Sequence, residues 1–342
     1  MSFLFVTNRG NGTVSAIRPD NLFSTLSTMQ RGTSALVASP DYSRLFVANS
    51  TSSTVSVFSL TNGSLLKQIP VGRYPVSLAV DPNGIACYVL NRESRTVTFI
   101  DMITLTASPS EFSIGRNPLS IKTSPSGNAI YISYETEIVV YEPQTFSIVT
   151  RYPVGGANFM ELTPDGQKLI CTNFERSSIT MIVSPYSTNS QRTELLIHKG
   201  PTGLAITKDG LFAYVCCSTD NTIEVVSISG STPRAQRFIS RINSPSDIAF
   251  DSNDIFYYVT SAVDNVVYSL SRSGNRLDTY RNNNPRNPFS FSTPSYIIAT
   301  PELLNFRQVE QSTVVSISNS VNISAPKPFL IPDTRIDKII QT

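Results

Sequence analysis

One short motif recurs along most of the sequence and constrains the fold more than any other feature. Its clearest copy is LFVANSTSSTVSV at residues 45–57. The copies open on an aromatic or aliphatic residue, at Phe5, Phe46, Tyr88, Tyr131, Ile170, Tyr214 and Tyr258, with successive spacings of 41, 42, 43, 39, 44 and 44 residues. A period of this length with strand-like content is typical of radial repeats, in which one small sheet per period packs against its neighbours.

Each period contains four strand-like segments, named A to D from the centre of the ring outward. In the second period these are Ala35–Ser39, Leu45–Asn49, Thr54–Leu60 and Leu65–Val71. The C segment alternates apolar and polar residues, as half-buried strands do, whereas the B segments are apolar in runs. Turns rich in Pro, Asp, Asn and Gly separate A from B, because these residues suit tight-turn backbone angles. The sequence therefore predicts an all-β propeller of four-stranded antiparallel blades.

The two ends of the repeat region indicate how the ring closes. The first B segment, Phe3–Asn8, has no A segment before it, while Ser295–Thr300 has the A pattern and follows the seventh complete set of B, C and D. Placing this late segment as the innermost strand of blade one eliminates an open sheet edge. We therefore expect seven blades. The alternative is a degenerate eighth repeat that begins at Thr300, since Ser312-Thr313-Val314 resembles Ser53-Thr54-Val55.

The combined pattern, P-x-x-(L/I)-A-x-x-P-D-G followed by Y-V-T-N and N-T-V-S-V, resembles the YVTN repeat over about residues 3–300. That family of seven-bladed β-propellers is found in archaeal surface-layer proteins and periplasmic propellers. The resemblance implies the fold but little about chemistry, because members include surface-layer, nucleic-acid-binding and enzyme-associated propellers. The sequence departs from the motif in blades four and six, where Tyr134 and Cys217 replace its terminal Asn.

We expect two regions: a propeller at residues 1–300 and a C-terminal extension at residues 301–342. The extension contains one strand-like segment, 312–324, followed by the proline-containing stretch APKPFLIP. In the segment, apolar residues alternate with Ser and Asn at Val315, Ile317, Val321 and Ile323. A strand of this kind has unpaired backbone groups and must join a sheet. The sequence therefore predicts an interaction tail that docks by strand addition.

Candidate catalytic residues are scarce in the sequence. The only histidine, His198, lies in a predicted surface loop, so a Ser-His-Asp arrangement has one place to form. The four cysteines fall in or beside B segments without metal-ligand spacing, which favours free buried thiols in a reducing compartment. We predict no catalytic residue, no metal and no cofactor. Carboxylates that converge on the central tunnel from separate blades would instead favour a lactonase-like or metal-dependent enzyme.

Basic residues give the strongest binding signal, although the net charge is only +2. They fall in loops that share one face of a propeller, namely Arg31, Arg73, Arg116, Lys199 and Arg241 before A segments and Arg9, Arg92, Arg95 and Arg176 between B and C segments. Forked arginine donors suit a carboxylate-rich partner protein or an anionic glycan. Nucleic acid is less favoured, because there is no Trp and most Tyr and Phe residues lie on core strands; Tyr74, beside Arg73, is an exception.

The charge-poor composition, with 15% charged residues, favours a non-enzymatic propeller that acts as a rigid protein-interaction or structural module in a larger assembly, such as a virion or another exported particle. The alternatives are a nucleic-acid- or glycan-binding propeller and a lactonase-like or metal-dependent enzyme. The sequence shows no signal peptide and no apolar run of transmembrane length, so we expect no membrane insertion and a cytoplasmic location by default.

Overall fold

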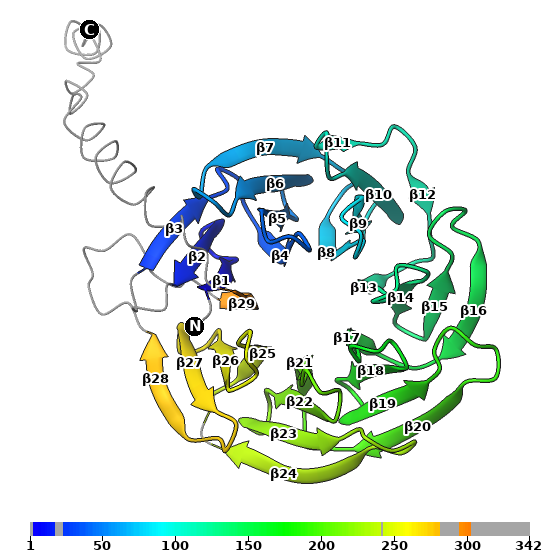
Figure 1. Cartoon of the computed structure of the whole chain (residues 1–342), viewed down its shortest axis with the longest axis vertical. Helices are drawn as coiled ribbons and strands as arrows, with labels where there is room; N and C mark the ends of the chain where they lie inside the picture. The colour runs from blue at the N-terminus through cyan, green and yellow to red at the C-terminus, as the bar shows by residue number, and fades with distance from the viewer. Residues whose placement is uncertain (1–2, 18–22, 241, 281–293, 302–342) are drawn as a thin grey trace, which may run out of the picture.

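The computed structural model describes residues 3–17, 23–240, 242–280 and 294–301, which form a ring of β-sheets around a central axis (Figure 1). Within these residues there are seven sheets and no helix, and in each sheet the strands pair antiparallel. No helix of the described chain is long and apolar enough to cross a membrane. The chain is therefore a seven-bladed all-β propeller, as the sequence predicted.

The blades follow the chain in order, and in each blade the strands run from the inner to the outer edge of the ring. Blade one contains β29 (Pro294–Thr300), β1 (Phe3–Asn8), β2 (Thr13–Ile17) and β3 (Phe23–Ser27); blade two contains β4 (Thr33–Ala38), β5 (Arg44–Asn49), β6 (Thr54–Ser59) and β7 (Leu65–Pro70); blade three contains β8 (Pro75–Val80), β9 (Ala86–Asn91), β10 (Thr96–Asp101), β11 (Thr106–Ala107) and β12 (Phe112–Ser113). Blade four contains β13 (Pro118–Thr123), β14 (Ile130–Tyr134), β15 (Glu137–Tyr141) and β16 (Ile148–Pro153); blade five contains β17 (Ala157–Leu162), β18 (Lys168–Asn173), β19 (Ser178–Val183) and β20 (Gln191–Leu196); blade six contains β21 (Pro201–Ile206), β22 (Phe212–Cys217), β23 (Thr222–Ser227) and β24 (Arg234–Ser240); blade seven contains β25 (Pro245–Phe250), β26 (Phe256–Ser261), β27 (Val266–Ser271) and β28 (Arg276–Tyr280). Among the described strands, only those of blade three depart from the four-strand plan, because two short strands replace its outer strand.

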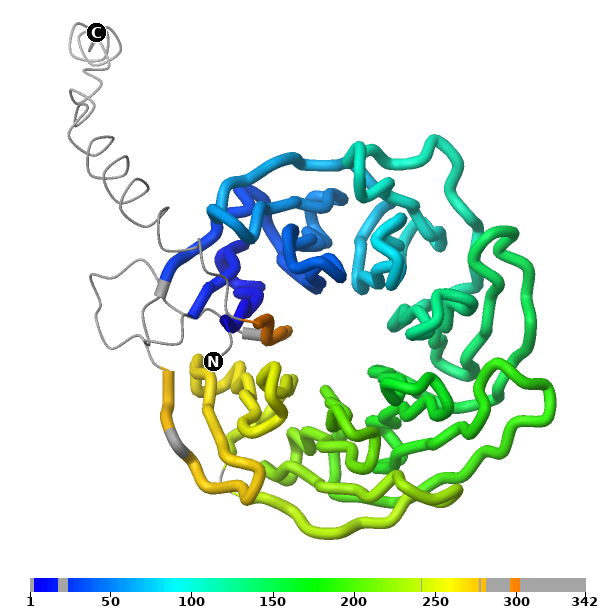
Figure 2. Tube along the Cα trace, viewed as in Figure 1, coloured from blue at the N-terminus to red at the C-terminus, as the bar shows by residue number. Residues whose placement is uncertain are grey.

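The ring closes as the sequence predicted. β29 pairs antiparallel with β1, so that Phe3 lies opposite Thr300 and Val6 opposite Ile297. Figure 2 shows the segment from 294 to 300 on the inner side of the N-terminal strand. Seven blades, rather than eight, are thus confirmed. The predicted tail, including Val315, Ile317, Val321 and Ile323, lies outside the described residues.

The Asn of the repeated motif ties the second strand of a blade to the third. Asn49 donates from Nδ2 to Thr54 Oγ1 at 3.2 Å and to Ser56 Oγ at 3.0 Å. Asn91 makes the same pair of bonds to Thr96 and Thr98. A buried amide needs such partners, because an unpaired one would lose its bonds to water without compensation. The repeat N-x-x-x-x-T-x-(S/T) is therefore a structural signature rather than a chemical one.

The hydrophobic core is divided into seven clusters, one between each pair of neighbouring blades. The cluster between blades two and three, for example, joins Phe46 and Val57 to Cys87 and Ile100. All four cysteines are buried and free, as expected. Burial raises the pKa of the Cys87 thiol well above its usual range. These thiols therefore serve as small core side chains.

Candidate active site in the central channel

A cavity of about 580 Å³ occupies the middle of the ring. The inner strands of the blades line it, most of them with two or more consecutive residues. The third residues of these strands are Ala35, Ser77, Ser120, Phe159, Gly203, Asp247 and Tyr296, and the fifth residues are Val37, Ala79, Lys122, Glu161, Ala205, Ala249 and Ile298. Most of these side chains are small, so the few large or charged ones stand out. The volume falls within the usual range for small-molecule sites.

A bulge near the start of each inner strand sets the direction of these side chains. In blade seven, Pro245 lies opposite Ser261 but Asp247 lies opposite Thr260, so Ser246 is the extra residue. Equivalent shifts occur near the start of the other inner strands, including β29. A bulge turns the following residue away from the regular alternation, and bulges are common beside active sites. In every blade except the sixth, the third residue of the inner strand lines the cavity.

Asp247 is the most perturbed acid at the cavity. Its residue is only 8% exposed, and its Oδ2 accepts the Ile297 backbone N–H at 3.1 Å. Burial raises the pKa of this carboxyl to about 7, against the lowering effect of backbone N–H groups and of the Lys122 charge. Gly203 on the adjacent strand makes room for it, since a Cβ there would lie 2.4 Å from Asp247 Oδ1. At neutral pH this carboxyl is therefore poised to accept or donate a proton.

Lys122 and Glu161 supply an ion pair on the same cavity. Lys122 Nζ lies 2.6 Å from Glu161 Oε2, and this ion pair joins blade four to blade five. Burial disfavours the ammonium, but the neighbouring Glu161 carboxylate outweighs this and raises the pKa of Lys122. Lys122 thus stays charged at neutral pH, at a position where it also acts electrostatically on Asp247.

Tyr296 lies opposite Phe159 across the channel, with ring centroids 5.9 Å apart. Its backbone N–H donates to Thr7 Oγ1 at 3.1 Å, which fixes the start of β29. Burial and the nearby Asp247 carboxyl both raise the pKa of the phenol, so it stays protonated and can donate a hydrogen bond. A proton acceptor, a cation and a phenol donor therefore line the same cavity from three different blades.

The structure gathers only some of the predicted basic residues. Arg9, Arg31 and Arg92 line two smaller cavities at the upper face, defined as the face where the inner strands begin. The other described members of the predicted set, Arg73, Arg95, Arg116, Arg176 and Lys199, are exposed on loops of the same face. Arg241 lies outside the described residues.

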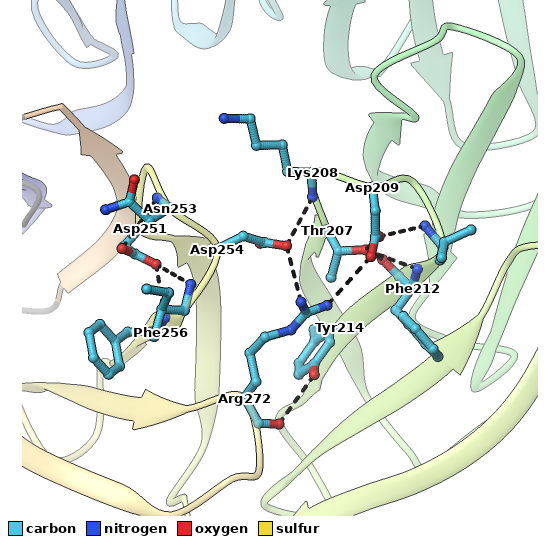
Figure 3. Close-up of polar contacts among 12 residues, drawn as sticks. Thr207, Lys208, Asp209, Phe212, Tyr214, Asp251, Asn253, Asp254, Phe256 and Arg272 are labelled. Atoms are coloured by element: carbon cyan, nitrogen blue, oxygen red, sulfur yellow. Dashed lines mark hydrogen bonds and ion pairs between the residues drawn. The ribbon is translucent and has the colours of Figure 1, made fainter.

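Two further polar clusters lie away from the central cavity. His198, expected in a surface loop, is about one-third exposed and contacts the buried Glu224 through Nδ1. At the lower face, Arg272 lies between Asp254 and Asp209 and links blades six and seven (Figure 3). In the described part of the chain, no group of three or more His, Cys, Asp or Glu side chains is arranged to hold a metal ion.

The fold and cavity together define a seven-bladed propeller with an acid–base group in its central channel. Residues 2–106 match the family model described as lactonase, 7-bladed beta-propeller. Solved structures with the same fold include a functionally unknown protein from Desulfotomaculum acetoxidans, at 13% identity and a TM-score of 0.75 over 88% of this chain and 100% of that one. They also include the periplasmic gluconolactonase of Pseudomonas aeruginosa (16%, 0.69, 88% and 99%) and a putative 6-phosphogluconolactonase from Bacteroides uniformis (14%, 0.71, 87% and 99%). No curated protein sequence matches this chain significantly.

These matches correct two expectations from the sequence. The interpretation as a non-enzymatic interaction or structural module is wrong, because the lactonase family model matches the first blades. The prediction that this protein is not an enzyme is contradicted by the same family match. The low fraction of charged residues was a poor guide to function, because a site in the channel of a propeller needs only a few charged side chains.

Sequence reasoning missed Asp247, Lys122, Glu161 and Tyr296. Each comes from a different blade, and none stands within a recognisable catalytic motif. The signal that could have found them is the register of the repeat. When the seven inner strands are aligned, the third and fifth positions hold small residues in most blades and these larger or charged residues in the rest.

Proposed function

We propose that this protein is a lactonase-type hydrolase whose reaction takes place at Asp247 in the central channel. The observation that carries the proposal is the buried carboxyl, with a pKa raised to about 7, that lines a cavity of about 580 Å³. The lactonase family model over residues 2–106 supports the reaction class. We also propose that the repeats are of the YVTN type, because the Y-V-T-N and N-T-V-S-V patterns recur in them.

The residues suit the hydrolysis of a cyclic ester. The Asp247 carboxylate accepts a proton from a water molecule as that water attacks the lactone carbonyl carbon. The carbonyl oxygen becomes negatively charged, and the Lys122 ammonium stabilises this charge. When the ring C–O bond breaks, the leaving alkoxide takes the proton from the Asp247 carboxylic acid, either directly or through the Tyr296 hydroxyl, which gives up its own proton and receives the one from Asp247. The products are one hydroxy acid and the regenerated carboxylate.

Glu161 has a positioning role in this reaction. Its contact with Lys122 at 2.6 Å keeps the ammonium charged and fixes its place on β13. A free lysine chain has several rotatable bonds and would lose this placement. The Glu161→Gln variant should therefore lower kcat less than removal of the ammonium does.

The test is hydrolysis of glucono-1,5-lactone by the purified full chain, followed as proton release near pH 7. Asp247→Asn should lower kcat by about 10²- to 10⁴-fold, and Lys122→Met by about 10²-fold or more. Glu137→Gln is the matched control, because this carboxylate pairs with Arg151 on the outer part of blade four. Circular dichroism and melting establish that each variant is folded. A folded Asp247→Asn variant with parental turnover would refute the proposal.

A further inference from the structure

One wall of the central cavity is apolar. Blades six, seven and one supply it near the ends of their inner strands, through the fifth and sixth residues of β21, β25 and β29. In blades four and five the equivalent fifth residues are Lys122 and Glu161. The six residues that we call the apolar wall all line the cavity, and they are Ala205, Ile206, Ala249, Phe250, Ile298 and Ala299.

The apolar wall is only partly buried, although it lies in the middle of the ring. Each of its residues has intermediate exposure, whereas Leu204 and Ile248 on the same strands are 6% and 4% exposed. Contacts behind the wall fix its shape, since the ring of Phe250 packs edge-on against Tyr214 with centroids 5.0 Å apart. Apolar side chains that keep contact with water around a cavity are typical of ligand sites, because a ligand buries what folding leaves exposed.

The apolar wall begins beside the proposed catalytic carboxyl. Asp247 lies two residues before Ala249 on β25, and its Oδ2 accepts the backbone N–H of Ile297, which directly precedes Ile298 on β29. A strand rises about 3.3 Å per residue, so Phe250 lies about 10 Å further along β25 than Asp247. The wall is therefore long enough to cover a short alkyl chain that starts at the carboxyl.

The cavity opens at the lower face. Tyr42 and Pro164 line it, and both lie exposed in turns that join the first two described strands of their blades. Phe250 is the last residue of its inner strand, so the apolar wall extends toward this opening. A ligand can therefore lie along the channel with a polar end at Asp247 and an apolar end toward the lower face.

An amphipathic lactone matches this division of the cavity better than a sugar lactone does. The polar groups that line the cavity at the level of Asp247 are Ser77, Ser120 and Tyr296, and they suit the ester of a lactone ring. An alkyl group would bury apolar surface against the apolar wall. Sugar hydroxyls at the same place would lose hydrogen bonds to water, because none of the six side chains can donate or accept one.

We propose that the apolar wall is a subsite for an alkyl group of the substrate, so that this protein hydrolyses lactones that carry an alkyl chain on the ring. The ring lies at Asp247 and the chain extends toward the lower face. This inference rests on the proposed function, because it names the substrate class of that reaction. Alkyl-substituted lactones are then preferred over sugar lactones with the same ring.

The test is the hydrolysis of a homologous series of δ-lactones by the purified full chain. δ-Hexalactone carries a methyl group and δ-decalactone a pentyl group on the same ring, so the difference in kcat/KM reports how the alkyl group is bound. Each added methylene should raise kcat/KM about three- to fourfold. The preference for δ-decalactone over δ-hexalactone should therefore be about 100-fold.

The double variant Ile206→Thr, Ile298→Thr makes the apolar wall polar and keeps the β-branched side chains that suit strands. Its preference for δ-decalactone should fall to about tenfold or less. Ile85→Thr, Ile255→Thr is the matched control, because these isoleucines are 62% and 53% exposed in turns of the lower face and do not line the cavity. Thermal unfolding establishes that both variants are folded, and the single variant Ile298→Thr replaces the double variant where that one does not fold.

The outcomes separate this inference from the proposed function. Equal kcat/KM along the series, with hydrolysis lost in Asp247→Asn, would refute the alkyl subsite and leave the proposed function standing. An equal loss of preference in the control variant would also refute the subsite. If no lactone is hydrolysed, the proposed function fails, and calorimetry with 2-pentyltetrahydropyran, which has the ring and the alkyl chain but no ester, decides about the wall. Binding that is tighter than that of tetrahydropyran and weakened only in the Ile206 and Ile298 variant supports an alkyl site, and absence of binding to the parental chain refutes it.

Discussion

Two of the buried aspartates of blade seven, Asp247 and Asp254, have opposite roles in the fold. Asp247 lies on the inner strand β25, and Asp254 lies in the turn between β25 and β26. Their exposed fractions are 8% and 9%, so they are equally removed from solvent. Burial raises the pKa of both carboxyl groups. Burial by itself therefore does not distinguish a reactive carboxyl from a structural one.

The position of the nearest cation distinguishes them. Asp254 Oδ2 lies 3.6 Å from Arg272 Nη1 and accepts the Lys208 backbone N–H at 3.2 Å, so this carboxyl links blades seven and six (Figure 3). Asp247 faces a cavity instead, and the lysine that acts on it is held by Glu161 at 2.6 Å. Among the described residues Asp247 forms no direct ion pair. A carboxyl kept from its cation in this way can exchange protons with a ligand.

The largest expected effect is on the pH dependence of stability. The pKa of Asp247 is about 7 in the folded chain and close to 3.8 when unfolded. A raised folded pKa contributes stability below the unfolded pKa, and this contribution is lost as pH rises through the folded pKa. Between pH 4 and 8 the parental protein should therefore lose up to about 4 kcal/mol relative to Asp247→Asn.

Denaturant unfolding of both proteins across this range measures the difference. Comparison with the Asn variant is needed because some carboxyls have lowered pKa values and act in the opposite direction at low pH, namely Asp41, Asp101, Asp165 and Asp209. Asp254→Asn serves as a second reference, since the pKa of the Asp254 carboxyl is also raised. A stability gap between the parent and Asp247→Asn that does not change with pH would contradict the buried-acid assignment.

The second prediction concerns the pH dependence of lactone hydrolysis. The carboxylate form of Asp247 is the active one, so kcat/KM should rise about tenfold per pH unit below 7 and level off above it. From pH 5 to 7 the gain is about 50-fold, and the plateau above pH 7 lies about 100-fold above the value at pH 5. Lys122→Met should move the midpoint upward, because the Lys122 charge lowers the pKa of Asp247. Asp254→Asn should leave the midpoint where it is, and a shift in that variant would show that the two aspartates are coupled.

The sequence predicted the fold better than the site for a physical reason. Closure by Ser295–Thr300 and the count of seven blades follow from a repeat that spans about 300 residues, so each copy supports the others. The site depends on single positions in different blades. Asp247, Lys122 and Tyr296 are brought together only by the curvature of the ring, and the raised pKa of Asp247 depends on burial that a sequence does not show. Arg9, Arg31 and Arg92 were predicted as part of a larger basic set, and only the folded ring shows that these three line cavities at the upper face.

The third prediction concerns the space beside Asp247. A methyl group at residue 203 would meet Asp247 Oδ1 at 2.4 Å and the Asp247 Cα at 2.6 Å. Gly203→Ala should therefore cost about 1–3 kcal/mol of stability through overpacking, and it should lower kcat by displacing the carboxyl. Gly230→Ala is the control, because its nearest neighbours lie at 3.9 Å and its φ is not in the left-handed region. Thermal unfolding and turnover are measured together, and equal effects of the two substitutions would contradict the close approach.

The smallest expected effect comes from the ion pairs at Asp254. Arg272 lies 3.6 Å from Asp254 and 3.9 Å from Asp209, and its side chain is 39% exposed. Solvent screens such pairs, so Arg272→Met should destabilise the ring by only about 0.5–1 kcal/mol. A double-mutant cycle with Asp254→Asn, measured by thermal unfolding at low and high salt, isolates the pair. Salt should reduce the coupling energy, since exposed charges are screened within about 10 Å at 0.1 M. Activity should stay at the parental level, because these residues hold two blades together at the lower face, away from the central cavity. A loss of turnover in Arg272→Met would remove the distinction between the two aspartates.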